Sequence, residues 1–286
     1  MTSSPSQGDL ALSGSIPTSA PAATAGSHGQ SGTTSMGTQP TTPPKTSPSS
    51  AESAICKKTV ASRPPGKIYY ADDNAGIYIL HGDCREILPT LAPVDLVLTD
   101  PPYKVGWAKR ATWGSSNAGA VRDYGKQEWD AETPTPETFA LILTRGRESI
   151  LWGGNHFADA LPRSSGWFVW DKDNTGDFAD CELAWTSLES AVRKFRYRWN
   201  GMLQQDMKNK EHRQHPTQKP VPLMQWCLGK VPSARTILDP YMGSGTTLVA
   251  AKNMGLSATG IDREERYCEI AAKRLSQEVL DFGVSA

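Results

Sequence analysis

The stretch "TILDPYMGSGTTLVAAKNMGLSATGID", residues 236–262, decides the fold, because it reads as strand, turn, helix and strand in direct succession. The first strand ends at Asp239, a turn holds Gly243 and Gly245, and the second strand ends at Asp262. Two strands joined by a helix predict a parallel pair with a crossover connection. Glycines in such a turn let backbone N–H groups approach a ligand, and the start of the following helix favours an anionic group.

Asp262 adds a second signal to this turn, since it lies nineteen residues after Gly243 at the end of the next strand. An acid there can accept hydrogen bonds from both hydroxyls of a ribose. Turn and acid together predict a nucleoside cofactor. No Gly-Lys-Ser/Thr follows the glycines, so the loop is not a phosphate loop. The alternative is a tight strand–helix turn without a ligand.

On either side of this stretch, strands and helices alternate along most of the chain. Strands are expected on either side of a turn at 74–76, and over 94–100, 149–155, 166–171 and 182–187. Helices are expected over 84–92, 135–148, 219–231 and 263–280. This order predicts an α/β fold, a Rossmann-like, doubly wound, mostly parallel sheet with helices on both faces.

The first 65 residues differ in composition from the rest. Ser, Thr, Pro, Gly and Ala dominate residues 1–50, which hold no Phe, Trp or Tyr. Such a segment cannot bury enough apolar surface to offset its chain entropy. We expect a disordered tail over 1–65 and one folded domain over 66–286.

Charge and cysteine content exclude several classes of protein. Thirty Lys and Arg balance thirty Asp and Glu, so contact with nucleic acid would need a local basic patch. The five cysteines are scattered and never spaced C-x-x-C, which argues against a disulfide framework or zinc site. No apolar run approaches the roughly 20 residues that span a bilayer, and no signal-peptide pattern opens the chain. We expect a cytoplasmic protein without a membrane partner.

A second unusual loop follows the apolar strand at 94–99, where the chain reads Asp100-Pro101-Pro102-Tyr103. The prolines fix φ and remove two N–H donors, so the loop presents acceptors, namely the Asp100 carboxylate and a prolyl carbonyl. Tyr103 adds an aromatic face. Two acceptors beside a stacking plane suit a planar group that carries an –NH2. The alternative is a proline turn that ends a strand, with the tyrosine in the core.

These motifs resemble those of the S-adenosyl-L-methionine-dependent DNA amino-methyltransferases, the N6-adenine/N4-cytosine family. The similar segments are "ILHGDCREIL" (79–88), "TDPPY" (99–103), "HPTQKPVPLMQW" (215–226), "LDPYMGSGTTLVAA" (238–251) and "GIDREERYCEIAAKRL" (260–275). With the catalytic motif first and the cofactor loop near the C-terminus, the order is that of the circularly permuted β group. The resemblance covers about residues 67–277 and implies short target-recognition insertions at about 104–128 and 190–214.

The resemblance also implies roles for individual residues. Catalysis and base holding would fall to Asp100, Pro101, Pro102 and Tyr103. Asp262 would bind the ribose, Asp83 would lie near the adenine of the cofactor and Lys219 near its carboxylate. The full set of implied cofactor-binding residues is Asp83, Lys219, Asp239, Tyr241, Gly243, Ser244, Gly245, Thr246 and Asp262. The family often has Phe where Tyr241 stands and Glu where Asp262 stands.

The expected function is transfer of a methyl group from S-adenosyl-L-methionine to N6 of adenine in a short sequence of double-stranded DNA, after the base flips out of the helix. An Asp at the head of the motif favours adenine within the family. The alternatives are an N4-cytosine DNA methyltransferase, an RNA or protein-amide methyltransferase of the same fold, and a DNA-binding module that holds cofactor without catalysis. A C5-cytosine enzyme would need a cysteine after a proline, and no cysteine here follows one. Oligomeric state, monomer or homodimer, and a restriction endonuclease partner stay open.

Two basic segments are candidates for DNA contact. Residues 193–213 interleave basic and aromatic side chains, and strand alternation would put Lys194, Arg196 and Arg198 on one face. Gln204, Gln205 and Asn209 are candidates to read base edges. The second segment follows the catalytic motif and contributes Lys104, Lys109 and Arg110.

Two further features are interpreted as structural. "DKDNTGDFADCE" (171–182) fits part of a calcium-loop pattern, but Thr175 stands at its fifth position and its flanks read as strands, so no metal is expected. His156 and the nine tryptophans are interpreted as packing residues.

Overall fold

The structure is a computed structural model that describes residues 63–103, 133–173, 179–200, 203–211, 214 and 217–277, with the backbone of 112–113 and 122–123. The chain divides into two units, Met1–Ile55 and Cys56–Ala286, and every described residue belongs to the second. The tail expected over 1–65 therefore lies almost entirely outside the described residues, as does most of the insertion expected at about 104–128.

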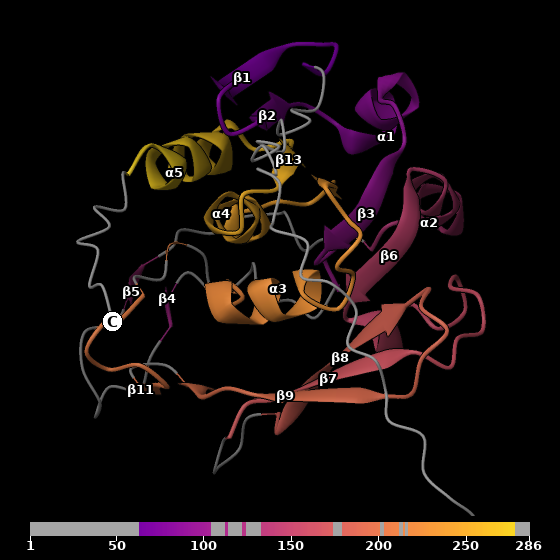
Figure 1. The fold of residues 1–286 in the computed structure, drawn as a ribbon, viewed down its shortest axis with the longest axis vertical. Coiled ribbons are helices and arrows are strands. Elements are labelled where there is room, and N and C mark those ends of the chain that lie inside the picture. Colours follow the sequence, from indigo (N-terminus) through magenta and orange to yellow (C-terminus); the bar gives the residue numbers. More distant parts are fainter. Residues whose placement is uncertain are drawn as a thin grey trace, which may run out of the picture. The chain divides into compact units, whose positions relative to one another are not determined.

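A nine-stranded sheet forms the centre of the described unit, in the order β1-β2-β13-β12-β3-β6-β8-β7-β9 (Figure 1). Its strands are β1 (Ile68–Asp72), β2 (Ile77–His81), β3 (Val94–Thr99), β6 (Gly146–Trp152), β7 (Trp167–Asp171), β8 (Cys181–Thr186), β9 (Arg193–Arg196), β12 (Thr236–Asp239) and β13 (Ser257–Asp262). Two short hairpins stand apart, β4 (Thr112–Trp113) with β5 (Arg122–Asp123) and β10 (Trp199–Asn200) with β11 (Leu203–Gln204).

The sheet has a parallel centre and antiparallel additions. β2, β13, β12, β3 and β6 pair in parallel, so their carboxyl ends meet at one edge of the sheet. β1 joins β2 as an antiparallel hairpin across the expected turn, and β8 runs antiparallel to both β6 and β7. The mostly parallel α/β sheet predicted from the sequence is confirmed.

Helices cover both faces of this sheet (Figure 1). α3, α4 and α5 share one core with the apolar side chains of that face, which include Ile79, Leu96 and Ile237. On the opposite face, α1 and α2 contribute to a second core around Leu80, Val97 and Leu238. The helices are α1 (Cys84–Ile87), α2 (Pro136–Leu143), α3 (Val221–Leu228), α4 (Thr246–Asn253) and α5 (Glu265–Ser276). None of the described helices is long and apolar enough to cross a bilayer.

Local sequence explains where these helices begin and what they bury. Thr135 caps α2 by accepting the N–H of Thr138, and Pro136 occupies the first turn, where its missing N–H is not needed. α5 buries Tyr267, Cys268, Ala271 and Leu275, which recur at the spacing of one helical face.

The helix expected over 135–148 is shorter than predicted. α2 ends at Leu143, and β6 begins at Gly146. Pairing with β3 overrides the helical pattern here, since Val94 N–H donates to the carbonyl of Arg145 and Gly146 lies opposite Val94. A Cβ at Gly146 would lie 3.0 Å from the backbone N of Val97, so the close strand approach also selects glycine at this position.

The turn between β12 and α4 depends on two glycines with different surroundings. Gly243 and Gly245 both have positive φ, 50° and 77°. A Cβ on Gly245 would lie 2.8 Å from the Cβ of Ala271 in α5, whereas nothing lies within 4 Å of the corresponding position on Gly243. Gly245 therefore lets α5 pack on the loop, and Gly243 leaves open space beside it.

Gly245→Ala is expected to destabilise the fold by about 2–5 kcal/mol, since a left-handed backbone costs about 1–2 kcal/mol and forced overlap costs a further 1–3. Gly243→Ala carries the backbone cost alone and serves as the matched control. Urea unfolding of both variants measures the difference. Equal losses of stability in the two variants would contradict this packing role for Gly245.

Candidate active site

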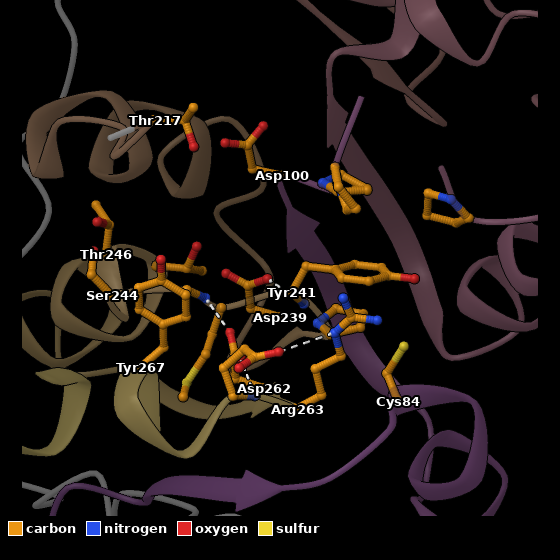
Figure 2. Close-up of a pocket in the computed structure, with 18 of the residues that line it drawn as sticks. Cys84, Asp100, Thr217, Asp239, Tyr241, Ser244, Thr246, Asp262, Arg263 and Tyr267 are labelled. Carbon is orange, nitrogen blue, oxygen red and sulfur yellow. Dashed lines mark hydrogen bonds and ion pairs between the residues drawn. The ribbon is translucent and has the colours of Figure 1, made fainter. Parts of the chain in front are cut away.

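Four aspartates stand at the carboxyl ends of four adjacent parallel strands. Asp83 follows β2, Asp262 ends β13, Asp239 ends β12 and Asp100 follows β3. All four line one cavity of about 400 Å³, a volume within the range of small-molecule sites. In Figure 2 Asp100 and Thr217 lie across the cavity from Asp262 and Arg263, with Asp239 and Tyr241 between them. The expected catalytic and cofactor motifs therefore share one site.

Asp262 is tied to the glycine turn. Its Oδ2 accepts the N–H of Gly243 at 3.0 Å, and its Oδ1 accepts the N–H of Glu264 at 2.8 Å. Burial nevertheless raises the pKa of this carboxyl to about 7, because these hydrogen bonds offset only part of the lost hydration. Asp262 thus changes charge near neutral pH.

Asp239 holds the start of the same turn. Its Oδ1 accepts the hydroxyl of Thr99 at 2.7 Å and the N–H of Tyr241 at 3.2 Å, so the carboxylate links β12 to β3 and to the turn. Burial raises the pKa of Asp239 to about 6. These bonds give Asp239 a role in the shape of the cavity. Of the other expected cofactor residues, Tyr241, Gly243, Ser244 and Thr246 also line it.

Asp83, which follows β2, is the outermost of the four aspartates and also stabilises its own helix. Its side chain caps α1 by accepting the N–H of Arg85 at 2.8 Å, and it forms an ion pair with the guanidinium of the same residue at 2.5 Å. Both residues line the cavity. Its position beside the adenine of a cofactor stays a prediction.

Asp100 is held by two donors. Lys219 Nζ lies 2.5 Å from its Oδ2, and the Tyr103 hydroxyl donates to its Oδ1. Lys219 also lies 3.2 Å from the Tyr103 hydroxyl and is 4% exposed. Burial raises the pKa of Asp100, although the lysine opposes the shift. For Lys219, burial works against the charged form, but Asp100 and Glu182 raise its pKa and keep it protonated.

The Tyr103 ring has an aromatic setting that the sequence did not suggest. It stacks on the His156 ring with centroids 4.9 Å apart and planes 11° from parallel, and it packs against Phe157. Gly153, after β6, has φ 72°, and a Cβ there would overlap the Tyr103 ring. The Gly-Gly-Asn sequence after β6 therefore makes room for the tyrosine, and His156 packs against a candidate site residue.

Glu182 on β8 is a site residue that the sequence interpretation missed. Its Oε2 lies 3.1 Å from Lys219 Nζ, and its Oε1 pairs with the ammonium of Lys172. Burial would raise the pKa of Glu182, but the two lysines outweigh it and lower the pKa to about 2. The available signal was an acid at the start of an otherwise apolar strand. Sequence spacing alone could not pair it with Lys219, 37 residues later.

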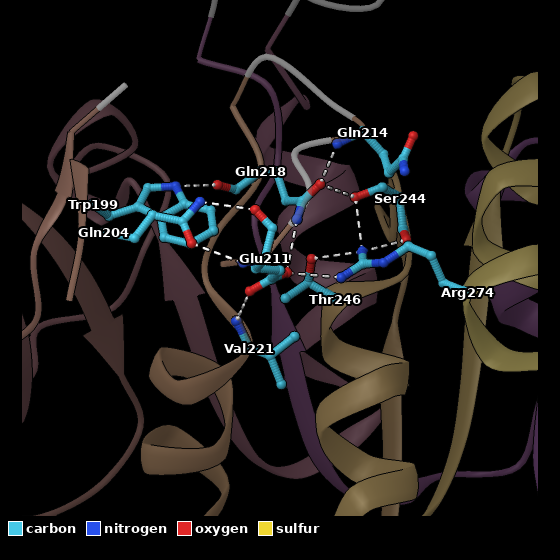
Figure 3. Close-up of polar contacts among 9 residues, drawn as sticks. All are labelled: Trp199, Gln204, Glu211, Gln214, Gln218, Val221, Ser244, Thr246 and Arg274. Carbon is cyan, nitrogen blue, oxygen red and sulfur yellow. Dashed lines mark hydrogen bonds and ion pairs between the residues drawn. The ribbon is translucent and has the colours of Figure 1, made fainter. Parts of the chain in front are cut away.

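A polar cluster connects the cofactor loop to the segment before α3 (Figure 3). Arg274 of α5 donates to the Ser244 carbonyl at 2.7 Å and pairs with Glu211 at 2.9 Å. Glu211 also accepts from the Gln218 amide at 2.8 Å and from the N–H of Val221 at 3.1 Å. The loop that carries Ser244 is thus fixed to Glu211, and through it to Gln218 and Val221, by a mostly buried ion pair.

The basic face expected at 193–198 exists, but acids already pair with it. Lys194 lies 3.2 Å from Asp171, and both Arg196 and Arg198 pair with Asp173. The aromatic residues of this strand turn the other way, with Phe195 packed against Trp226. Asp171 and Asp173, which open the calcium-like pattern, are engaged by these cations. No cluster of three metal-ligating side chains occurs among the described residues.

The expectation that Gln204 reads base edges is wrong. Gln204 is 5% exposed, and its amide exchanges two hydrogen bonds of 2.8 Å with the backbone of Glu211. Its role is to brace the polar cluster. Gln205 accepts weakly from the N–H of Arg198, and Asn209 bonds to Asp206. Lys104, Lys109 and Arg110 lie outside the described residues.

Known DNA methylases and type II methyltransferases are similar in sequence to this chain. The sequence model of a family described as DNA methylase, the N6/N4 type, matches residues 163–273. The chain is 26% identical to the type II methyltransferase M2.LlaDCHI of Lactococcus lactis subsp. cremoris over 260 residues, 74% of this chain and 93% of that protein. It is 34% identical to M2.DpnII of Streptococcus pneumoniae over 153 residues, 52% of this chain and 50% of that protein.

A third relative, M.HinfI of Haemophilus influenzae, is 26% identical over 247 residues, 70% of this chain and 68% of that protein. Among solved structures, the M1.HpyAVI–SAM complex aligns with 69% of this chain and 99% of that chain, with 24% identity and a TM-score of 0.43. The family match and these relatives agree with the motif order. These similarities support an amino-methyltransferase of the N6-adenine/N4-cytosine type.

Proposed function

We propose that this protein transfers a methyl group from S-adenosyl-L-methionine to N6 of adenine in a short sequence of double-stranded DNA. One observation supports the proposal most directly: the Asp-Pro-Pro-Tyr loop and the glycine turn with Asp262 open into the same cavity. An amino group held at Asp100 would face a nucleoside cofactor held at Asp262. The Asp at the head of the motif favours adenine over cytosine, by resemblance to the family.

The cavity fits the cofactor in charge and shape. Its four aspartates suit a ligand that carries a sulfonium cation and two ribose donors. Gly243 leaves open space where any other residue would place a Cβ, so a ligand can approach the backbone of the turn. Asp262 would accept the ribose hydroxyls, and the turn at Gly243–Thr246 would surround the methionine part. When bound, the cofactor supplies an activated methyl group.

The protein's task is to orient the amino nitrogen, whose lone pair is delocalised into the base. If the Asp100 carboxylate and the Pro101 carbonyl accept its two hydrogens, the lone pair turns toward the methyl group. The carboxylate also stabilises the positive charge that develops on nitrogen. Asp100 is available to take the proton afterwards, since burial raises its pKa above the ordinary value.

A base inside a duplex cannot reach this cavity, so the target must flip out. Tyr103 would stack on the extruded base and offset part of the few kcal/mol that unstacking costs. Contacts with His156 and Phe157 hold the Tyr103 ring beside Asp100.

Asp100→Ala is expected to lower the methylation rate by about 10²–10⁴-fold, because the variant lacks the acceptor that orients and stabilises the nitrogen. The measurement is incubation with labelled S-adenosyl-L-methionine and unmethylated bacterial DNA, followed by digestion to nucleosides and mass spectrometry. Asp159→Ala, an exposed acid elsewhere, is the matched control. N6-methyladenine supports the proposal, and N4-methylcytosine would keep the mechanism but change the base. No methylated nucleoside from a folded, cofactor-binding protein would overturn the proposal.

Cofactor affinity is expected to rise about tenfold from pH 6 to pH 8. The Asp262 carboxyl, with a pKa of about 7, is mostly protonated at pH 6, and only the ionised form accepts both ribose hydroxyls well. Calorimetric titration with S-adenosyl-L-methionine across this window measures the effect. Asp262→Asn keeps an acceptor for the Gly243 N–H but has no carboxylate, so its affinity should be weaker and its pH dependence flatter. Parallel pH profiles in the two proteins would refute the role of Asp262.

The paired basic face offers a test of DNA contact. Arg196→Ala should weaken DNA binding and reduce the slope of log affinity against log salt by about 1, if Arg196 contacts one phosphate. Asp173→Asn should do the opposite, because it frees both arginines. Asn tolerates the positive φ of 49° at this position, so the exchange keeps the turn. The measurement is the affinity for a DNA duplex at several salt concentrations. If the affinity changes in the same direction in both variants, this face is not a DNA contact.

A further inference from the structure

We infer that Glu182 is a positioning residue for methyl transfer, one that receives the Lys219 ammonium when the target amino group takes its place on Asp100. The inference rests on the proposed function and deepens it. It assigns a role to an acid on β8 that belongs to neither the catalytic motif nor the cofactor loop.

Four charges of alternating sign form a row at the back of the site. Asp100 contacts Lys219 at 2.5 Å, Lys219 lies 3.1 Å from Glu182, and Glu182 pairs with Lys172. The side chains of all four are at most 25% exposed. Two acids and two bases cancel, so the row has no net charge. Removal of one member leaves an uncompensated charge near the Asp100 carboxylate.

Both oxygens of Asp100 are occupied in this arrangement. The Tyr103 hydroxyl donates to Oδ1 and the Lys219 ammonium to Oδ2. A target amino group needs one of these oxygens as its acceptor, and each oxygen has a second lone pair for it. The ammonium, however, is a poor neighbour for a nitrogen that becomes positive as the methyl group arrives. Methyl transfer is therefore favoured when Lys219 moves away from Oδ2.

Glu182 provides the alternative partner. Its Oε2 is buried and accepts no hydrogen bond of good geometry from the described residues, although Lys219 Nζ lies only 3.1 Å away. A small rotation of the lysine side chain completes that bond and frees Asp100. Lys219 then stays charged and paired, which avoids the cost of a buried, unpaired ammonium. Lys172 holds Glu182 in place from the other side, over the Trp170 ring at 5.1 Å.

Removal of the Glu182 charge changes the titration of Asp100. Glu182 raises the pKa of Asp100, and Lys219 lowers it. In Glu182→Gln the lysine acts alone, so the acidic limb of the kcat profile should move to lower pH. In Lys172→Met a cation is lost, and the same limb should move to higher pH. Asp100, Lys172 and Lys219 are the other charged members of the row. Two further titratable groups, Tyr103 and Asp239, interact with Asp100.

The test is steady-state methylation of unmethylated DNA by the full-length protein from pH 5.5 to 9. Glu182→Gln should lower kcat about 10–100-fold and leave the KM for S-adenosyl-L-methionine within about threefold, because Lys219 no longer has a charged acceptor away from Asp100. Glu182→Asp should restore part of the rate. Glu148→Gln on β6, whose carboxylate accepts from the Ser187 hydroxyl away from this row, is the matched control and should behave as wild type.

The outcomes separate this inference from the proposed function. A wild-type protein that methylates no DNA contradicts the proposed function before any variant is compared. An active wild type together with an unchanged kcat and acidic limb in Glu182→Gln overturns the role of Glu182. If Glu182→Gln does not fold, Lys172→Met decides, since a shift of its acidic limb to lower pH, or no shift, contradicts the inference.

Discussion

The parallel pairing of β2, β13, β12 and β3 is the constraint on which the rest of the site depends. Parallel strands place their carboxyl ends together, so a residue at or just after the end of each strand reaches the same edge. Here each of those residues is an aspartate. Apolar strands and helices on both faces reduce hydration at this edge, and the pKa values of Asp239 and Asp262 rise in consequence. Backbone N–H groups, hydroxyls and one lysine offset that cost.

The antiparallel strands of the sheet contribute to the balance of charges around Asp100. Asp100 comes from the parallel centre, but the acid that balances its lysine comes from β8, and Lys172 follows β7. Lys219, just before α3, bridges the two parts. The antiparallel strands therefore set the electrostatics of a carboxylate that lies outside them. Within the row, geometry and charge depend on each other, because each largely buried charge lies beside a partner of opposite sign.

A second link runs from the cofactor loop toward the basic edge. Arg274 holds the Ser244 carbonyl and Glu211 together, and Gln204 braces the backbone of Glu211. Gln204 follows β9 in the chain, and two cations of β9, Lys194 and Arg196, pair with Asp171 and Asp173. Two acids shared among Lys194, Arg196 and Arg198 neutralise only part of the positive charge at this exposed edge. These contacts connect Gln204, in the segment that follows β9, to the Ser244 loop that lines the cavity.

Several parts of this molecule could be predicted from the sequence because they depend on short-range rules. Alternating strands and helices gave the α/β sheet, and the prolines at 101–102 and glycines at 243 and 245 marked the two loops that open into one cavity. Alternation in 193–198 also separated the basic face from Phe195 correctly. These features depend on backbone propensity and strand periodicity, which neighbouring residues determine.

Only the tertiary structure decided which side chains meet. It ended α2 early because Gly146 pairs with β3, committed Gln204 to Glu211, and placed His156 on the Tyr103 ring. It also paired the basic face with acids and brought Glu182 beside Lys219. Each of these contacts joins segments through packing and burial, and an ion pair between distant residues leaves no periodic trace in the sequence. The sequence by itself determined which strands and loops build the site, and the tertiary structure determined how its charged side chains pair.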